Sequence, residues 1–184
     1  MTVPAPRTVL ALCASPSETS TTQRVLDDLV TPHLARLRIH VTALSLRRLP
    51  AEALLRGDAG HPALATAARR LDDADGVVIG TPVHKASFTG LLKVFLDVLP
   101  RHALAGKAVL PLATAHDRGH GPVLMRGLEP VLASMGGPRL APLCCLTAAD
   151  LAGGTRPDGT ALDRAVAGFA RMLRDPAHTG LVSC

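Results

Sequence analysis

The sequence predicts a doubly wound α/β fold, with a five-stranded parallel sheet in the order 2-1-3-4-5 and helices on both of its faces. Short apolar runs alternate with helical patterns along the chain, which is typical of a parallel sheet built from strand–helix–strand units. Several runs are continuously apolar, as expected for strands that are covered on both faces. Polar loops follow the first, third and fourth runs, where the ligand-binding loops of such a sheet meet.

The apolar runs give the predicted strands in order. The first (TVLALC) is continuously apolar, whereas the second alternates in part and is therefore expected nearer an edge. The fourth contains Pro111, which argues against a regular central strand, so a bulge or local break is expected there. The predicted strands cover residues 8–13, 39–46, 77–79, 107–114 and 140–146.

Amphipathic patterns between these runs predict the covering helices. Pro62 suits the first turn of one of them. Another is interrupted by Pro130 and ends at Gly136 and Gly137. The predicted helices cover residues 25–37, 62–74, 88–99, 123–135 and 160–174, with a single helical turn at 51–56 and a loop at 148–159.

Composition limits the class of protein. The 184 residues suit one domain, 1–184, with loose termini at 1–7 and 176–184. No apolar run approaches the roughly 20 residues of a membrane span, and the first residues lack a signal-peptide pattern, so we expect a cytoplasmic protein with no membrane contact. The net charge of +5 comes mainly from scattered arginines. With no Trp or Tyr and three Phe, the chain offers few rings for stacking bases, so nucleic-acid binding is not expected.

The cysteines indicate neither a disulfide framework nor a metal site, because no CxxC spacing is present. Most of them fall in predicted buried strands, where cysteine acts as a small apolar residue; they are Cys13, Cys144, Cys145 and Cys184. His116, Asp117 and His120 form a weak candidate for a metal site, and polar loop residues are the commoner meaning of such a set. We expect no metal.

A hydroxyl-rich loop separates the first strand from its helix. Residues 15–23 (SPSETSTTQ) carry six hydroxyl side chains in nine positions, which is more than helix capping needs. Hydroxyls and free amides at a helix N-terminus can hold a phosphate dianion without a lysine. The loop is neither a GxxxxGK[ST] motif nor a glycine-rich dinucleotide fingerprint. An ordinary N-cap region is the alternative.

Two further polar loops are expected beside it. The stretch TPVHKASFTGLLK at 81–93 joins the third strand to a helix, and Ser87 or Thr89 there can face a polar or anionic ligand edge. The stretch TAHDRGHG at 114–121 follows the fourth strand. Because the ends of the first, third and fourth strands are adjacent in the predicted order, the three loops should meet at the topological switch point.

These residues resemble the NAD(P)H-dependent FMN reductase family of flavodoxin-like fold, in particular its sulfonate-utilisation branch. The resemblance covers roughly residues 8–175 and is most specific in the block at 81–93. Its other parts are ASP at 14–16, ADGVVI at 74–79, LDVLP at 96–100, LAGK at 104–107 and VLPLAT at 109–114.

The resemblance implies FMN at the switch point and NAD(P)H as the reductant. Hydride transfer between stacked rings needs no protein acid or nucleophile, so no catalytic residue is expected. The phosphate-binding positions that it implies are Ser15, Ser17, Ser20, Thr21, Thr22 and Gln23. The positions implied beside the flavin ring are Pro82, Val83, His84, Lys85, Ala86, Thr114, Ala115, His116 and Gly119.

Some positions depart from the family's pattern. Ser17 replaces an arginine, which removes a charge partner of the phosphate, and His84 replaces a tyrosine. Ala115 and His116 stand where the family has two glycines. Arg126 takes the place of an inserted aromatic residue that is associated with tetramer packing and loosely held flavin.

The resemblance implies an enzyme that reduces FMN and supplies it to a partner flavin-dependent monooxygenase. Three alternatives stay open. The first is an FMN-bound quinone or azo reductase, and the second is a non-catalytic flavodoxin-like module, although the basic charge counts against an electron carrier. The third and weaker one is a degenerate member whose changed loops no longer bind flavin. The helix at 88–99 is too apolar for a lone surface helix, which predicts a homodimer or homotetramer. The preference between NADH and NADPH stays open, because the sequence carries no dinucleotide fingerprint.

Overall fold

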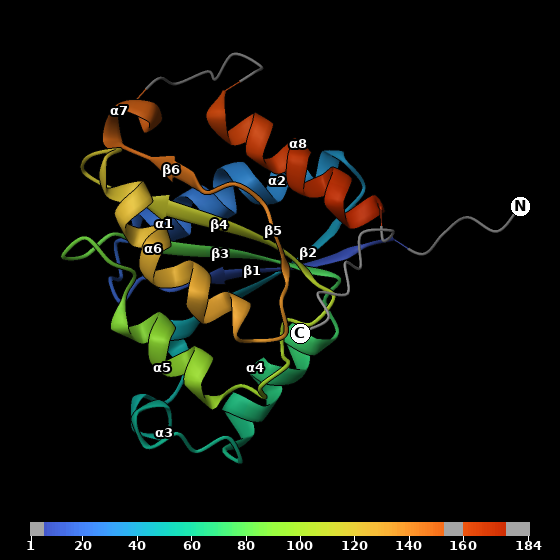
Figure 1. Ribbon diagram of the computed structural model, residues 1–184, viewed down its shortest axis with the longest axis vertical. Helices are drawn as coiled ribbons and strands as arrows, with labels where there is room; N and C mark the ends of the chain where they lie inside the picture. Colours follow the sequence, from blue (N-terminus) through green and yellow to red (C-terminus); the bar gives the residue numbers. More distant parts are fainter. Residues whose placement is uncertain (1–5, 153–159, 176–184) are drawn as a thin grey trace, which may run out of the picture.

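The computed structural model of the chain describes residues 6–152 and 160–175, which form a three-layer α/β/α arrangement (Figure 1). All strand pairs of the central sheet are parallel, and the strand order is β2-β1-β3-β4-β5, with β6 pairing β4. The predicted fold class and strand order are confirmed. The predicted loose termini fall mostly outside the described residues, but Arg7 is held in place, because it binds Asp75 at 2.8 Å.

The strands follow the predicted runs with two differences. β3 extends to Pro82, because Gly80 and Thr81 are buried and paired with β4. The predicted fifth strand is split into two short pieces. β2 lies at the edge, as expected. The bounds are β1 (Thr8–Cys13), β2 (His40–Ser45), β3 (Gly76–Pro82), β4 (Ala108–Thr114), β5 (Arg139–Leu140) and β6 (Cys144–Leu146).

Pro111 lies within a continuous β4, so the prediction of a bulge or break at this residue is wrong. The register with β3 runs unbroken through the pair Ile79–Pro111. The main chain of Val109 faces the fifth strand, where its carbonyl accepts from Ala141 at 2.8 Å. Since the main-chain groups of alternate residues in a strand point toward the same neighbouring strand, those of Pro111 also point toward the fifth strand. Its missing N–H lies beside the gap between β5 and β6, so the break lies in the neighbouring strand.

The helices cover both faces of this sheet. The first begins at Thr21, earlier than predicted, and continues through a π-helical stretch (Leu26–Val30) into α2. A short helix, α7, replaces part of the loop predicted at 148–159, of which 153–159 lie outside the described residues. The bounds are α1 (Thr21–Val25), α2 (Thr31–Arg36), α3 (Ala51–Arg56), α4 (Pro62–Asp72), α5 (Gly90–Val98), α6 (His120–Ala133), α7 (Ala148–Leu151) and α8 (Ala161–Arg174).

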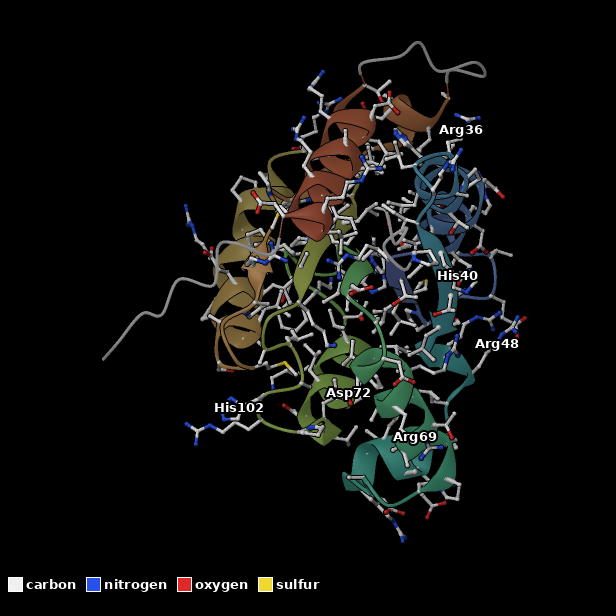
Figure 2. The ribbon with its side chains drawn as sticks, turned by 90° about the vertical axis from the view of Figure 1, so that its right-hand side faces the viewer. Arg36, His40, Arg48, Arg69, Asp72 and His102 are labelled. Carbon is white, nitrogen blue, oxygen red and sulfur yellow. The ribbon has the colours of Figure 1, made fainter. Side chains whose placement is uncertain are left out.

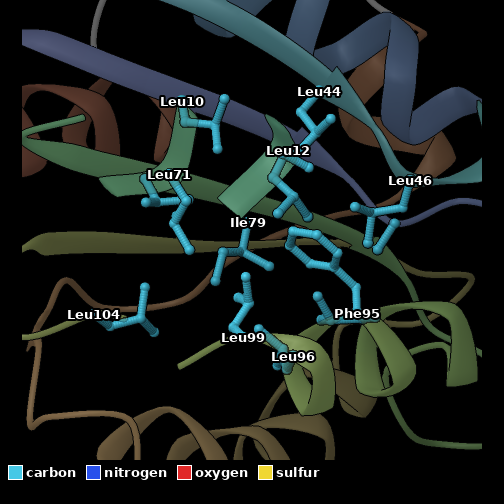
Figure 3. Packing of buried hydrophobic residues seen from close by; sticks show 14 of the residues in the cluster. Leu10, Leu12, Leu44, Leu46, Leu71, Ile79, Phe95, Leu96, Leu99 and Leu104 are labelled. Atoms are coloured by element: carbon cyan, nitrogen blue, oxygen red, sulfur yellow. The ribbon is translucent and has the colours of Figure 1, made fainter. Parts of the chain in front are cut away.

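Two apolar cores lie on the two faces of the sheet. One packs α3–α6 against strand residues such as Leu12 and Ile79, with Phe95 of α5 fully buried among them (Figure 3). The other packs α1, α2 and α8 around Phe169, which is also fully buried. Since both faces are covered, the sheet offers its carboxyl-terminal edge for a ligand. Within the described residues, no helix is both long and apolar enough to cross a membrane.

Candidate functional site

A hollow of about 370 Å³ opens at the carboxyl end of the sheet, where the segments that follow β1, β3, β4 and β6 meet. We call it the switch-point hollow, because α1 and α5 leave the neighbouring strands β1 and β3 toward opposite faces. It contains most of the predicted site residues. Those that line it are Ser15, Ser17, Ser20, Thr21, Thr22, Pro82, Val83, His84, Thr114, Ala115 and His116.

Half of the hydroxyls in the first loop are structural. Ser15 is buried and accepts from the Ser17 amide at 3.3 Å. Ser20 caps α1, since its Oγ accepts from the Gln23 amide at 3.0 Å. Thr22 is buried and bonds to the Thr114 hydroxyl at 2.6 Å, which joins the first helix to the end of β4. These three bonds fix the shape of the loop.

The other half of these hydroxyls face the hollow from exposed positions. Ser17, Thr19 and Thr21 are all exposed and line it. The amides of Thr21 and Thr22 lie in the first turn of a continuous helix, where no intrahelical acceptor exists, and the helix dipole there favours an anion. The loop therefore both caps a helix and presents hydroxyls and amides to the hollow, groups that can hydrogen-bond an anion.

Hydroxyl, apolar and histidine side chains line the hollow. Among the described residues that line it, none is Lys, Arg, Asp or Glu, and two are His84 and His116. Attraction for an anion therefore depends on hydroxyls, amides and the helix dipole. The replacement of the family's arginine by Ser17 fits this composition.

Close packing brings the first helix onto the centre of the sheet. A Cβ added at Gly80 of β3 would lie 2.9 Å from Leu26 Cδ1 and 3.0 Å from Thr22 Cγ2. Glycine at this position lets α1 approach β3, and so places the start of the helix at the edge of the switch-point hollow.

The loop after β3 forms a tight hairpin. His84 and Ser87 exchange main-chain bonds of 2.9 and 3.0 Å. Between them, Lys85 (φ 52°) and Ala86 (φ 60°) both adopt the left-handed conformation that glycine or asparagine usually occupies. The two residues form the hairpin tip and do not line the hollow, unlike Pro82, Val83 and His84.

Buried threonines anchor the base of this hairpin. Thr89 donates its hydroxyl to the Ala14 carbonyl at 2.8 Å and accepts from the Leu92 amide at 3.2 Å, so it caps α5 while holding it against the end of β1. Thr81, fully buried, accepts from the Thr89 amide at 3.3 Å. This network positions the β3 loop relative to the first loop.

A fourth wall comes from β6 and α7, which sequence reasoning missed. Leu146, Thr147, Ala148 and Leu151 line the hollow, and the Leu146 carbonyl accepts from the Ala115 amide at 2.9 Å. A signal for this wall was present in the sequence. The pattern Thr147-x-x-Asp150 after an apolar run is a capping box, which marks a helix start.

The capping carboxylate also ties two walls together. Asp150 accepts from the amide and the hydroxyl of Thr147, both at 2.8 Å, and forms an ion pair with Arg118 of the β4–α6 loop. The Thr147 amide lowers the pKa of Asp150 more than burial raises it, and the Thr147 hydroxyl and Arg118 lower it further. The carboxylate thus stays ionised at neutral pH.

Two other predicted residues lie outside the hollow. The Gln23 side chain donates to both oxygens of Asp27 at 3.0 Å and lines a neighbouring cavity. Gly119 precedes α6, and its amide donates to Asp117 at 2.5 Å. Within the described ranges, no group of three or more His, Cys, Asp or Glu side chains is placed to hold a metal ion.

The fold and the hollow define a doubly wound α/β protein of flavodoxin type, with a switch-point site suited to a phosphorylated ligand. The sequence model of the NADPH-dependent FMN reductase family matches residues 7–146. The chain belongs to this family.

Individual relatives agree with this assignment. The chain is 38% identical to FMN reductase (NADPH) of Escherichia coli (strain K12) over 127 residues, which cover 69% of this chain and 66% of that protein. The match thus spans about two thirds of the relative's length. The crystal structure of an apo NADH:FMN oxidoreductase (EMOB) aligns with a TM-score of 0.82 and 37% identity, covering 90% of this chain and 89% of the other. An archaeal flavodoxin at 13% identity (TM-score 0.61, 91% and 98% covered) shares the fold alone.

Proposed function

We propose that the protein is an NAD(P)H-dependent FMN reductase that supplies reduced flavin to a partner flavin-dependent monooxygenase. The observation that carries this proposal is the division of the switch-point hollow into two chemically different ends. Exposed hydroxyls and the first helix amides come from the loop after β1, whereas the loop after β3 and helix α7 contribute the partly buried apolar side chains Val83 and Leu151. A phosphorylated ring compound has the same division.

The residues present fit FMN. A volume of about 370 Å³ lies within the usual range for a small-molecule site. Ser17, Thr19 and Thr21, together with the first amides of α1, would hold the phosphate. Pro82, Val83 and Ala115 would border the ring system, and Leu151 of α7 would close the far side.

The protein's part in the reaction is positioning. When bound, FMN supplies a ring that accepts hydride from a reduced nicotinamide. Val83 and Leu151 would border the ring, and the threonine bonds at the base of the β3 hairpin hold the loop that carries Val83 in place. His84 and His116 are edge contacts in this proposal, and no side chain is required as an acid or base.

Anaerobic titration tests the activity and separates it from the alternatives. Purified protein receives excess FMN and then NADPH or NADH, while the visible absorbance of oxidised flavin is followed. We expect bleaching of many flavins per protein, and reduced flavin that passes an ultrafiltration membrane. Bleaching limited to one tightly held flavin would support a quinone or azo reductase instead. Binding without bleaching would indicate a non-catalytic flavin-binding module.

We further propose that the protein is a homodimer or homotetramer through α5. Phe88, Leu91, Val94 and Val98 follow one another at helical spacing and each stays only half-buried in the monomer. Their stripe would be covered by a second copy. Sedimentation at micromolar concentration should show an oligomer, and Val94→Lys should shift it toward monomer. Leu55→Lys, a change at a 77% exposed leucine on α3, is the matched control. A monomeric wild type would contradict the proposal.

A further inference from the structure

The α7 wall of the switch-point hollow has little packing of its own. The helix is four residues long, none of its residues is fully buried, and much longer helices are marginal in water on their own. Leu151 packs partly against the apolar core on the α8 face, whereas Ala148 is exposed. Both residues line the hollow. Polar contacts around α7 therefore matter for where this wall lies.

Two ties connect this wall to the loop after β4. The first is a main-chain bond, in which the Ala115 amide donates to the carbonyl of buried Leu146 at 2.9 Å. The second is the ion pair of Arg118 with Asp150, whose side chains are 65% and 18% exposed. The first tie lies at the end of β6 and the second within α7. Loss of the second tie would therefore free α7 from the loop after β4 while β6 stays paired.

The two carboxylate oxygens of Asp150 have different partners. Oδ2 accepts from the amide and the hydroxyl of Thr147, both at 2.8 Å, and so builds the capping box that starts α7. Oδ1 accepts from Arg118 and so attaches the helix to the neighbouring wall. Because the two roles belong to two atoms, a substitution can remove one role and keep the other.

Two other acidic groups lie near Arg118, and neither replaces Asp150 as its partner. The Asp117 carboxylate accepts from the Gly119 amide at 2.5 Å, next to the start of α6. Burial raises the pKa of the Cys145 thiol more than Arg118 lowers it, and Asp150 and Asp117 raise it further. The thiol therefore stays neutral at pH 7 and does not compete for the guanidinium group.

We propose that Arg118 is a positioning residue for the flavin: its ion pair with Asp150 holds α7 against the switch-point hollow and slows the release of FMN. The inference rests on the proposed function, because FMN is taken as the ligand of the hollow. There the flavin ring would lie between Val83 and Leu151, so it leaves more easily once α7 moves outward. The first loop holds the phosphate and does not depend on this ion pair.

Stopped-flow measurement of FMN release tests this role. Protein loaded with FMN is diluted rapidly, and the fluorescence of free flavin gives the dissociation rate constant. Arg118→Gln should raise this constant about three- to fivefold, as expected for a partly exposed ion pair. Asp150→Asn should have a similar effect, because its remaining oxygen can still accept from Thr147. The double variant should be no faster than either single variant, since both remove the same interaction.

Two further measurements test whether the charge of Arg118 is what matters. Arg118→Lys keeps a positive charge and should release FMN at close to the wild-type rate. Raising the NaCl concentration from about 0.05 M to about 0.5 M screens the ion pair, so it should accelerate release from the wild type more than from Arg118→Gln. A merely structural role would show neither response.

The ion pair of Arg56 with Glu52 supplies the matched control. Its charged atoms lie 3.0 Å apart on α3, and both side chains are mostly exposed. Figure 1 places α3 at the opposite end of the molecule from α7, and Figure 2 shows the same end from the side, where Arg69 of α4 is labelled. Arg56→Gln removes an ion pair there and should leave the rate of FMN release unchanged.

The outcomes separate this inference from the proposed function. Faster release in both single variants, with rescue by lysine and Tm values within about 2 °C of the wild type, supports the inference. An unchanged release rate in Arg118→Gln overturns it and leaves the FMN reductase proposal standing, because FMN still binds and is reduced. Faster release with a large fall in Tm, or with additive effects, also overturns it, since the pair would then support the fold in general. A wild type that binds no FMN overturns both proposals.

Discussion

Replacing Gly76 with alanine is expected to lower the free energy of unfolding by about 2–3 kcal/mol, because the added carbon has no room. It would lie 2.6 Å from Leu173 Cδ2, 2.9 Å from the Ala108 carbonyl oxygen and 3.1 Å from Phe169 Cζ. The two side chains belong to the buried face of α8. The carbonyl belongs to β4, whose pairing with β3 begins at these two residues, so it cannot move without loosening the sheet.

Thermal unfolding followed by circular dichroism measures this effect. For a chain of this length, the expected loss corresponds to a fall in Tm of about 5–10 °C. Gly90→Ala is the matched control, because no atom lies within 4 Å of the carbon it adds at the start of α5. That variant should be neutral or more stable by up to about 1 kcal/mol. A Tm for Gly76→Ala that equals the wild-type value would mean that α8 packs on the sheet less closely than described.

Replacing Ser17 with aspartate is expected to weaken FMN binding by roughly a hundredfold. Ser17 is exposed and lies in the part of the switch-point hollow where we propose that the phosphate binds, and no Lys, Arg, Asp or Glu lies among the described lining residues. A carboxylate there would repel the phosphate at short range, and about 2–3 kcal/mol is a reasonable cost in a partly solvated site. Its side chain makes one weak contact, with the Thr19 hydroxyl at 3.5 Å, so folding should be unaffected.

A positive charge at the same position should have the opposite effect on FMN affinity. Ser17→Arg supplies a charge-assisted bond to the same phosphate and should tighten FMN binding by about tenfold or more. Riboflavin, which lacks the phosphate, is the control ligand, and its affinity should be unchanged by either substitution. Fluorescence quenching on titration measures all four cases. Equal responses of FMN and riboflavin would show that the phosphate lies elsewhere.

The sequence was sufficient to predict the layers and the convergence of loops. Continuous apolar runs such as 8–13 identify buried parallel strands, and the strand order then places the loops after β1, β3 and β4 together. The sequence alone could not tell which hydroxyl side chains of the first loop hold the loop together and which face the hollow. Whether Ser15 stabilises the loop or Ser17 faces the hollow depends on burial that neighbouring elements decide.

Other features depended on pairing between distant segments. Pro111 argued against a regular strand by local rules, and its tolerance comes from the gap opposite it in the fifth strand. Gln23 belongs by sequence to the hydroxyl-rich loop, but the turn of α1 directs it toward Asp27. Lys85 and Ala86 stand next to a lining residue, and the hairpin carries them past the hollow. In each case the outcome depends on contacts or geometry that the neighbouring residues in the sequence do not reveal.

The interrupted fifth strand separates structural support from contact with the hollow. β5 pairs with the amino-terminal half of β4 and β6 with its carboxyl-terminal half, and Pro111 between them supplies no donor to either. Cys144 and Leu146 hold β6 in the core on the α8 face, whereas Ala148 and Leu151 of α7, which line the switch-point hollow, are less buried. A substitution on α7 can therefore change the wall of the hollow without altering the register of β5 or β6.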